Sequence, residues 1–386
     1  KNQIQFIFII AGDVKKMTKE EIKKNPYEYI NNFMEESLIH VGRKTFSILS
    51  LMPCSLILPN IPFTSSSIRS NINLIYIAPS SSGKSTLCSN FENFSYFPLK
   101  RRSISASELS MKANEMKLLT LIIEDFSQTS EDYETIKVIE GIIGEEQNIS
   151  KSNMRVEFLE KIKGVGFLCG TPTDLDRYAK SLEGGLLSRC MVIYLYHTPK
   201  QHSEIGDFIN SKIGEEDHSD RMKEKEQIII NYYKELQLIQ EGKHEKIKPI
   251  QHYLIDKEFK MKAGNVWKKI TEKLIEEMGD KYWIRDLGDF YRILVSSAFL
   301  NVFNREHENG VLKPNEEDFK LALELMKQNM KYKWAIIKST ELNKKIKNYD
   351  VLLDYLNSER ISPSVKNILM NISPYSHLIR DKFNQD

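Results

Sequence analysis

Short apolar runs and helix-like stretches alternate through the middle of the chain. Four runs of strand length lie at Leu74–Ile77, Leu118–Ile123, 164–169 and 190–196, and segments with a helical hydrophobic period separate them. This alternation is typical of βαβ units, whose parallel strands are covered by helices on both faces. We therefore predict an α/β fold with a parallel sheet over residues 71–200.

The hydrophobic pattern changes beyond this sheet. Polar and charged residues dominate 200–230, which predicts a linker or surface excursion, and the chain then follows a helical period up to residue 345. Pro314-Asn315 signals a helix start. We expect a second, all-helical domain over 201–345, including this linker, and a short helical tail over 346–386. The apolar stripes behind this prediction are Leu287, Phe290, Tyr291, Leu294 and Ala298, and Phe319, Ala322, Leu323 and Met326.

The first 70 residues read as a helical region that precedes the sheet. Their hydrophobic period predicts helices at Lys19–Lys24 and 27–52, closed by a series of prolines that begins at Pro53. The chain begins at Lys1 rather than at Met, so the sequence leaves open whether a further segment precedes it.

Composition narrows the class of protein. With 41% hydrophobic and 28% charged residues among 386, the chain can build a large core under a polar surface. Its apolar runs are too short for a membrane helix, and its start lacks the layout of a secretory signal. The four cysteines stand far apart with no C-x-x-C pair, which argues against a zinc ribbon or disulfide framework and favours a reducing, cytoplasmic setting.

The net charge of the chain does not show whether it binds nucleic acid. The 55 basic and 53 acidic residues leave a net charge of +2, which neither demands nor excludes nucleic acid. Lys100-Arg-Arg102 is a local basic run, and it fits a solvated face as well as an anion contact.

A phosphate-binding loop follows the first predicted strand. The pattern A-x-x-x-x-G-K-S lies between that strand and a helix start, which is the setting that a P-loop requires. Backbone N–H groups would cradle the phosphates of ATP, Lys84 would reach the β- and γ-phosphates, and the Ser85 hydroxyl would ligate Mg²⁺. The alternative is a serine-rich turn that opens an ordinary helix. The residues expected to bind ATP are Ala78, Pro79, Ser80, Ser81, Ser82, Gly83, Lys84, Ser85 and Thr86.

Two carboxylates end the second predicted strand. Glu124 and Asp125 would lie at the carboxyl edge of a parallel sheet, beside the phosphate loop. By position Glu124 would hold the Mg²⁺ water shell and Asp125 would polarise the attacking water. The order Glu-Asp reverses the usual one, so the division of roles stays open, as does the reading of both as solvent-facing acids.

Three further segments carry a family resemblance. Glu146-Gln-Asn-Ile-Ser-Lys151, Gly166-Phe-Leu-Cys-Gly-Thr-Pro172 and Gly185-Leu-Leu-Ser-Arg-Cys190 resemble, in order and spacing, the ATPase core of minichromosome-maintenance (MCM) helicases of the AAA+ class. Trp283-Ile-Arg-Asp-Leu-Gly-Asp-Phe-Tyr-Arg292, with the segment 311–326, looks like the helical lid of that family.

The resemblance implies roles for four residues. Thr171 falls at the sensor 1 position, where that family carries asparagine, and Arg285 falls on the sensor 2 arginine. Arg189 falls on the arginine finger, which would act on the ATP of a neighbouring subunit. Lys151 lies near the tip of a pore hairpin that would contact DNA, although an ordinary surface hairpin is the alternative.

Two functions compete on this basis. The first is an ATP-driven motor that moves on DNA as a homo-oligomeric ring, with a hexamer favoured. The second is an AAA+ protein remodeller or ATP-dependent switch, which the near-neutral charge favours slightly. The interval from Ser85 to Glu124 is shorter than in MCM proteins, and their N-terminal DNA-binding domain is not recognisable. A monomeric P-loop kinase leaves the segment around Arg189 unexplained.

Overall fold

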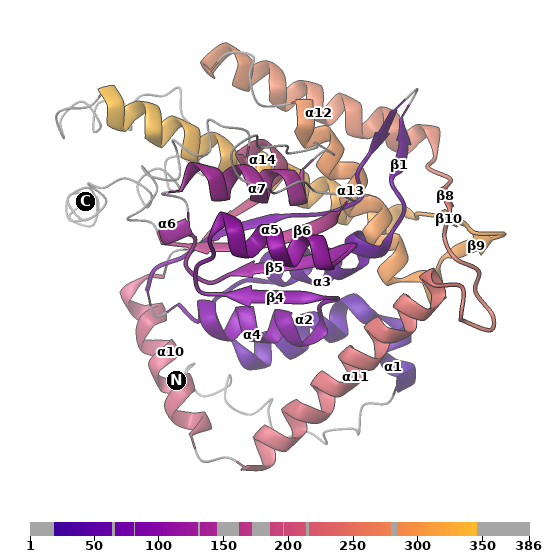
Figure 1. Ribbon diagram of the computed structural model, residues 1–386, viewed down its shortest axis with the longest axis horizontal. Helices are drawn as coiled ribbons and strands as arrows, with labels where there is room; N and C mark the ends of the chain where they lie inside the picture. The colour runs from indigo at the N-terminus through magenta and orange to yellow at the C-terminus, as the bar shows by residue number, and fades with distance from the viewer. Residues whose placement is uncertain are drawn as a thin grey trace, which may run out of the picture.

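A five-stranded parallel sheet forms the centre of the protein (Figure 1). The computed structural model describes residues 19–345 except 64–65, 81, 130–131, 145–161, 172–185, 196, 214–215 and 279–283. The strand order is β4-β5-β6-β3-β7, and every neighbouring pair is parallel. The strands are β3 (Leu74–Ile77), β4 (Pro98–Arg101), β5 (Leu118–Ile123), β6 (Lys163–Gly170) and β7 (Met191–Tyr194). The predicted α/β parallel sheet is therefore confirmed.

Strand β4 is the one strand of this sheet that the apolar pattern did not predict. Its sequence, Pro-Leu-Lys-Arg, buries only Leu99 fully. It lies at the edge of the sheet, where it pairs with β5 alone. An edge strand tolerates both an initial proline and charged side chains, because one of its sides needs no hydrogen-bond partner from the sheet.

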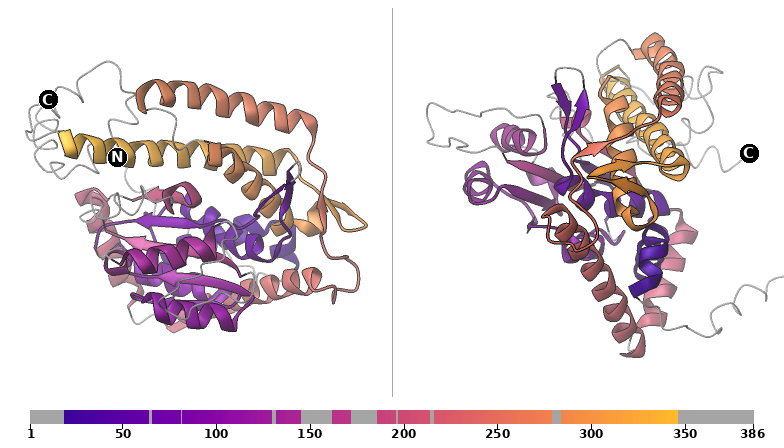
Figure 2. Two further views of the ribbon diagram at one scale, coloured as in Figure 1. Left: turned by 45° about the horizontal axis from the view of Figure 1, so that its top comes forward. Right: turned by 90° about the vertical axis from the view of Figure 1, so that its right-hand side faces the viewer.

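The crossover connections place helices on both faces of the sheet. Helix α4 (Lys84–Phe94) leads outward from β3 to β4, whereas α5 (Ala106–Glu115) and α7 (Tyr133–Ile143) lead back towards β3. Right-handed crossovers that run in opposite directions lie on opposite faces. Figures 1 and 2 show this arrangement, with α5 and α7 across the sheet from α4.

The predicted helix at 27–52 is two helices in the structure. Helix α1 (Lys19–Lys24) is followed by α2 (Pro26–Ser37) and α3 (Arg43–Ile57). The break lies where His40 and Gly42 adopt positive φ angles of 62° and 90°, which a continuous right-handed helix excludes.

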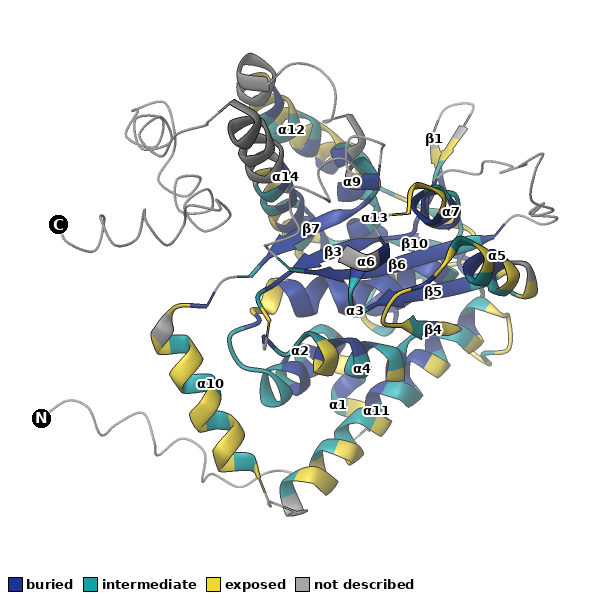
Figure 3. Cartoon of the chain, turned by 60° about the vertical axis from the view of Figure 1, so that its left-hand side comes forward, coloured by how far each residue is buried: buried dark blue, intermediate teal, exposed yellow. Residues whose placement is uncertain are grey.

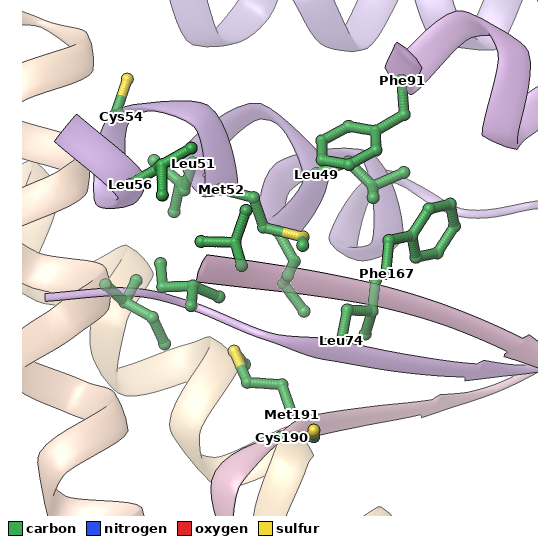
Figure 4. Close-up of a cluster of buried hydrophobic side chains, with 14 of the residues drawn as sticks. Leu49, Leu51, Met52, Cys54, Leu56, Leu74, Phe91, Phe167, Cys190 and Met191 are labelled. Carbon is green, nitrogen blue, oxygen red and sulfur yellow. The ribbon is translucent and has the colours of Figure 1, made fainter. Parts of the chain in front are cut away.

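Helix α3 continues through Pro53, although proline was predicted to end it. Every residue from Thr45 to Leu56 is buried. A proline inside a helix costs about 3 kcal/mol, but each fully buried Leu or Phe side chain returns roughly 1.5–3 kcal/mol. In Figure 4, Leu49 and Met52 of α3 lie in one cluster with Leu74, Phe91 and Phe167 from the sheet and α4.

The polar stretch predicted as a linker is helical. Helix α10 (Pro199–Lys212) and the first half of α11 (Glu216–Gln240) occupy it. The Thr198 side chain caps α10 in a reciprocal box with Gln201. Figure 3 shows α10 as largely exposed, which explains its polar sequence.

Three long helices follow α11. They are α12 (Lys257–Met278), α13 (Ile284–Leu300) and α14 (Glu316–Lys345), with a small sheet of β8 (His252–Tyr253), β10 (Val311–Lys313) and β9 (Glu306–Glu308). Helix α13 packs against α3, α14 packs against β7, and α12 packs against α13 and α14. The predicted start signal is confirmed, because Asn315 Oδ1 accepts from the backbone N–H groups of Glu317 and Asp318 at 3.0 and 3.2 Å. The predicted stripes bury Phe290, Leu294 and Ala298, and Phe319, Ala322 and Met326.

Helices α13 and α14 share a buried ionic cluster next to β7. Lys333 Nζ lies 2.7 Å from Asp286 Oδ1 and 3.5 Å from Asp289 Oδ2. Asn329 donates to Asp289 and accepts from the backbone N–H of Val192 on β7 at 2.9 Å. These helices therefore join the core of the sheet, and one cluster of buried hydrophobic residues extends through both.

In the part of the chain that the structure describes, no helix has the length and apolar character needed to cross a membrane.

Candidate nucleotide-binding site

The predicted phosphate loop connects β3 to α4. Gly83 precedes the first residue of α4 with a left-handed backbone, φ 78° and ψ 16°. A Cβ atom at Gly83 would also lie 2.7 Å from Cδ2 of Leu38, in the turn between α2 and α3. Glycine meets both demands because it has no side chain. The loop can therefore approach a ligand with its backbone.

Lys84 folds back over the loop. Its Nζ atom donates to the backbone carbonyls of Ala78 at 2.8 Å and Pro79 at 2.6 Å. Burial lowers the pKa of Lys84, and the nearby Cys169 and Asp125 oppose this shift. An ammonium group in this position is ready to exchange two carbonyl oxygens for phosphate oxygens, which are stronger acceptors.

The other loop residues present hydroxyl groups. Ser85 and Thr86 are exposed at the start of α4. Ser82 is buried, and its hydroxyl has no hydrogen-bond partner among the described residues. A buried hydroxyl without a partner is costly, and a bound phosphate would satisfy it. Ser81 lies outside the described residues.

The two predicted carboxylates extend the pairing of β5 with β4. The backbone N–H groups of Glu124 and Asp125 donate to the carbonyls of Arg101 at 3.0 Å and Arg102 at 2.9 Å. Since all five strands are parallel, Glu124 and Asp125 lie at the same edge of the sheet as the phosphate loop.

Lys100 on β4 is a site neighbour that the sequence did not single out for this role. Its Nζ atom lies 3.4 Å from Glu124 Oε1 and 3.1 Å from Glu92 Oε2, and it donates to Ser89 Oγ at 2.7 Å. Hydrogen bonds to Glu92 and Glu124 outweigh partial desolvation and raise the pKa of Lys100. A metal ion bound at Glu124 would therefore have to compete with Lys100 for the carboxylate.

Strand β6 lies between the loop strand and the carboxylate strand. The backbone N–H of Ala78 donates to the carbonyl of Gly170, the last residue of β6, at 3.1 Å. Thr171 is the next residue, so it lies between the phosphate loop and Glu124 along the sheet edge. Cys88 on α4 and Cys169 on β6 also touch, with Sγ atoms 3.4 Å apart.

Arg189 lies at the opposite edge of the sheet. It ends α9 (Leu186–Arg189), just before β7, and its carbonyl accepts from Asn73 Nδ2 at 2.9 Å at the beginning of β3. Four strand residues at ~3.3 Å each, roughly 13 Å, separate this position from the loop. Its guanidinium packs on Gly144, where a Cβ would lie 2.6 Å from Arg189 Nε.

Two predicted residues cannot be placed fully. The backbone of Arg285 belongs to the first turn of α13, but its side chain lies outside the described residues. Lys151 and the segment around it lie outside them as well.

The donor set fits ATP with Mg²⁺. Among the described residues, no three His, Cys, Asp or Glu side chains gather as a metal site. Magnesium in phosphate-transfer sites takes most of its ligands from water and phosphate and only one or two from the protein. Ser85 and Glu124 would supply that number of protein oxygens.

Comparison with protein-family models finds no match to this chain, and comparison with curated proteins finds no match either.

Proposed function

We propose that this chain is a Mg²⁺-dependent ATPase. The observation that carries the proposal is the convergence of Lys84, Thr171, Glu124 and Asp125 at one edge of a parallel sheet, beside a loop whose backbone turns through Gly83. A nucleotide at this edge would have its phosphates on the loop and its γ-phosphate towards the carboxylates.

Each residue has a role that its surroundings support. Lys84 leaves the carbonyls of Ala78 and Pro79 for the β- and γ-phosphates. Ser85 and Glu124 would hold Mg²⁺, which would neutralise charge on those phosphates. Asp125 orients the attacking water and accepts its proton.

The wider proposal is a ring-forming AAA+ motor on DNA, resembling MCM helicases. The position of Arg189 supports it, because the backbone of this residue lies beside the beginning of β3, away from the phosphate loop of its own subunit, as action on the ATP of a neighbouring subunit requires. A protein remodeller is the alternative, and the net charge of +2 favours it slightly. Stimulation of ATP hydrolysis by single-stranded DNA, but not by an unfolded polypeptide, distinguishes the two.

Calorimetric titration with ATP and Mg²⁺ tests the nucleotide site. Lys84→Ala removes a charge-assisted contact of about 1.5–3 kcal/mol, so the affinity for ATP should fall about 10- to 100-fold. Lys112→Ala, which removes a partly exposed lysine of α5, is the matched control and should bind ATP like the parent chain. Equal affinities of the folded Lys84→Ala variant and the parent would refute the assignment.

The carboxylates are tested by turnover. Glu124→Gln and Asp125→Asn should each retain ATP binding and lose most hydrolysis, because the first weakens the metal site and the second removes the base. Parental turnover in both variants would place the chemistry elsewhere.

A further inference from the structure

A basic groove lies between the start of α3 and helix α14, away from the two carboxylates of the nucleotide site. It has a volume of about 410 Å³, and its lining includes Lys44, Lys320, Lys327 and Lys331, with Glu324 and Tyr332. We call it the lysine groove. It contains four cationic side chains and one anionic one.

Most of the positive charge in the lysine groove is not neutralised. Lys44 pairs with Glu324 at 3.0 Å. Lys320, Lys327 and Lys331 are exposed, and they form no ion pair or hydrogen bond with any other described residue. Lysines at i and i+4, as at 327 and 331, repel each other by a few tenths of a kcal/mol. The arrangement is therefore slightly unfavourable for the helix and favourable for an anionic ligand.

The three unpaired lysines form a cationic line along α14. Residues 320, 327 and 331 lie on one face of α14, opposite the face that buries Phe319, Ala322 and Met326. At ~1.5 Å per residue, the line from 320 to 331 covers roughly 17 Å. A ligand with regularly repeated negative charges matches such a line.

We propose that the lysine groove binds the sugar–phosphate backbone of single-stranded nucleic acid. Repeated cations along a groove hold successive phosphates, and an aromatic side chain in the same groove offers a surface on which a base can stack. Tyr332 is half-buried in the lining and provides that surface. A single strand can enter a concave groove of this volume, whereas a duplex presents a convex backbone.

Two other anionic ligands fit the groove less well. A membrane surface requires apolar side chains that project beside the cations, and Leu323, the apolar member of the lining, is only partly exposed. A single small anion requires donors that converge, whereas these lysines are spread along the helix axis. The inference concerns a surface distinct from the nucleotide site and stands whether or not ATP is hydrolysed.

Fluorescence anisotropy with a labelled 20-nucleotide oligo-dT, without ATP, tests the proposal on the full chain. The triple variant Lys320→Ala/Lys327→Ala/Lys331→Ala should bind at least about tenfold more weakly, and the slope of log K against log salt should shrink by about 2, since three single-strand phosphate contacts are lost. The control Lys200→Ala/Lys223→Ala/Lys268→Ala removes the same charge from exposed helix positions elsewhere and should change affinity less than twofold.

The outcomes separate this proposal from the others. Equal weakening in both triple variants, or no binding by the parent chain, overturns it. The proposal is also overturned if phosphatidylserine vesicles or polyglutamate, at equal charge concentration, displace the labelled oligonucleotide from the protein. If the triple variant does not fold, Lys327→Glu alone should weaken binding at least fivefold, and unchanged affinity would overturn the proposal. Lys84→Ala should retain parental oligonucleotide affinity, so a failure of the ATP site leaves this test intact.

Discussion

Lys100 holds the Glu124 carboxylate in an ion pair. The two side chains form an ion pair of 3.4 Å, and Glu92 shares the same ammonium group. Coordination of Mg²⁺ by Glu124 would require this pair to loosen, because Lys100 and the metal ion would share a single negative charge. Glu92 would then retain Lys100.

We therefore expect Lys100→Met to raise the apparent affinity for Mg²⁺. A partly exposed ion pair contributes up to about 1 kcal/mol, so the Mg²⁺ concentration at half-maximal ATP hydrolysis should fall by as much as about fivefold. Titration of turnover with Mg²⁺ at saturating ATP measures it. A higher Mg²⁺ requirement in the variant would instead make Lys100 a positioning residue for Glu124.

A second lysine makes stability depend on pH. Lys163, at the amino end of β6, donates to the Leu58 carbonyl and to Ser70 Oγ at 2.6 Å. Burial, assisted by Arg69, lowers the pKa of Lys163 to about 7. Between this pKa and the ordinary lysine value near 10.4 the unfolded chain binds more protons than the folded one, so this residue makes stability rise with pH in that range.

Lys163→Met should remove this dependence. At pH 7 the variant should be more stable than the parent, because the parent must desolvate or deprotonate its lysine. The difference in unfolding free energy between the variant and the parent should shrink by about 2 kcal/mol between pH 7 and pH 9. The reason is that each unit of pH changes the contribution of Lys163 to the stability of the parent by up to about 1.4 kcal/mol. Urea denaturation at both pH values measures it, and a constant difference would contradict the assignment.

At the scale of elements, α13 and α14 depend on the buried cluster around Lys333. Burial raises the pKa of Asp286 to about 6, and Lys333 opposes that rise. Removing the cation leaves the buried Asp286 without an ion-pair partner, whereas Asp289 keeps Arg292 at 2.5 Å, and an uncompensated buried charge costs about 3–5 kcal/mol.

Lys333→Met should therefore destabilise the protein by about 3–5 kcal/mol at pH 7, and the loss should diminish as the pH falls and the carboxylates take up protons. Thermal unfolding at pH 7 and pH 5 measures both effects. The matched variant Lys331→Met, on the exposed face of the same helix, should change stability by less than about 0.5 kcal/mol.

The elements differ in how well the sequence predicts them. Buried strands such as β5 can be predicted from continuous apolar runs, because helices cover both of their faces. The hydrophobic pattern does not predict strand β4 or helix α10, because edge and surface elements bury few side chains. Thr198-Pro199 and Gln201 did carry a usable signal for α10, namely its capping box.

The candidate nucleotide-binding site and the lysine groove also differ in how well the sequence predicts them. The phosphate loop and the two carboxylates are predicted from local motifs, because each motif has its reactive residues within one short segment. The pairing of Lys100 with Glu124 depends on the register between β4 and β5, and the lysine groove depends on α3 meeting α14. Neither contact can be predicted from one segment alone.

At the scale of the whole molecule, hydrolysis should depend on assembly. If Arg189 acts on the ATP of a neighbouring subunit, turnover per chain rises with protein concentration. Arg189→Ala should lose turnover by about 10³-fold or more while retaining ATP binding, as for an arginine finger.

Mixing two inactive variants tests this directly. Lys84→Ala and Arg189→Ala chains should restore activity together, because a mixed interface pairs one intact loop with one intact arginine. Light scattering with ATP bound reports the assembly. A rate that is independent of concentration, from a monomer, would exclude action between subunits.

The central position of α3 has a consequence during synthesis on the ribosome. This helix leaves the ribosome before β6, α11 and α13, on which its buried surface packs. Roughly 240 further residues must be translated before α13 emerges, which takes about 12–50 seconds at 5–20 residues per second. Throughout that interval the face of α3 that packs on α13 lacks its partner. We expect nascent chains of this length to require a chaperone that holds α3, and Pro53 to slow any premature association by weakening the isolated helix.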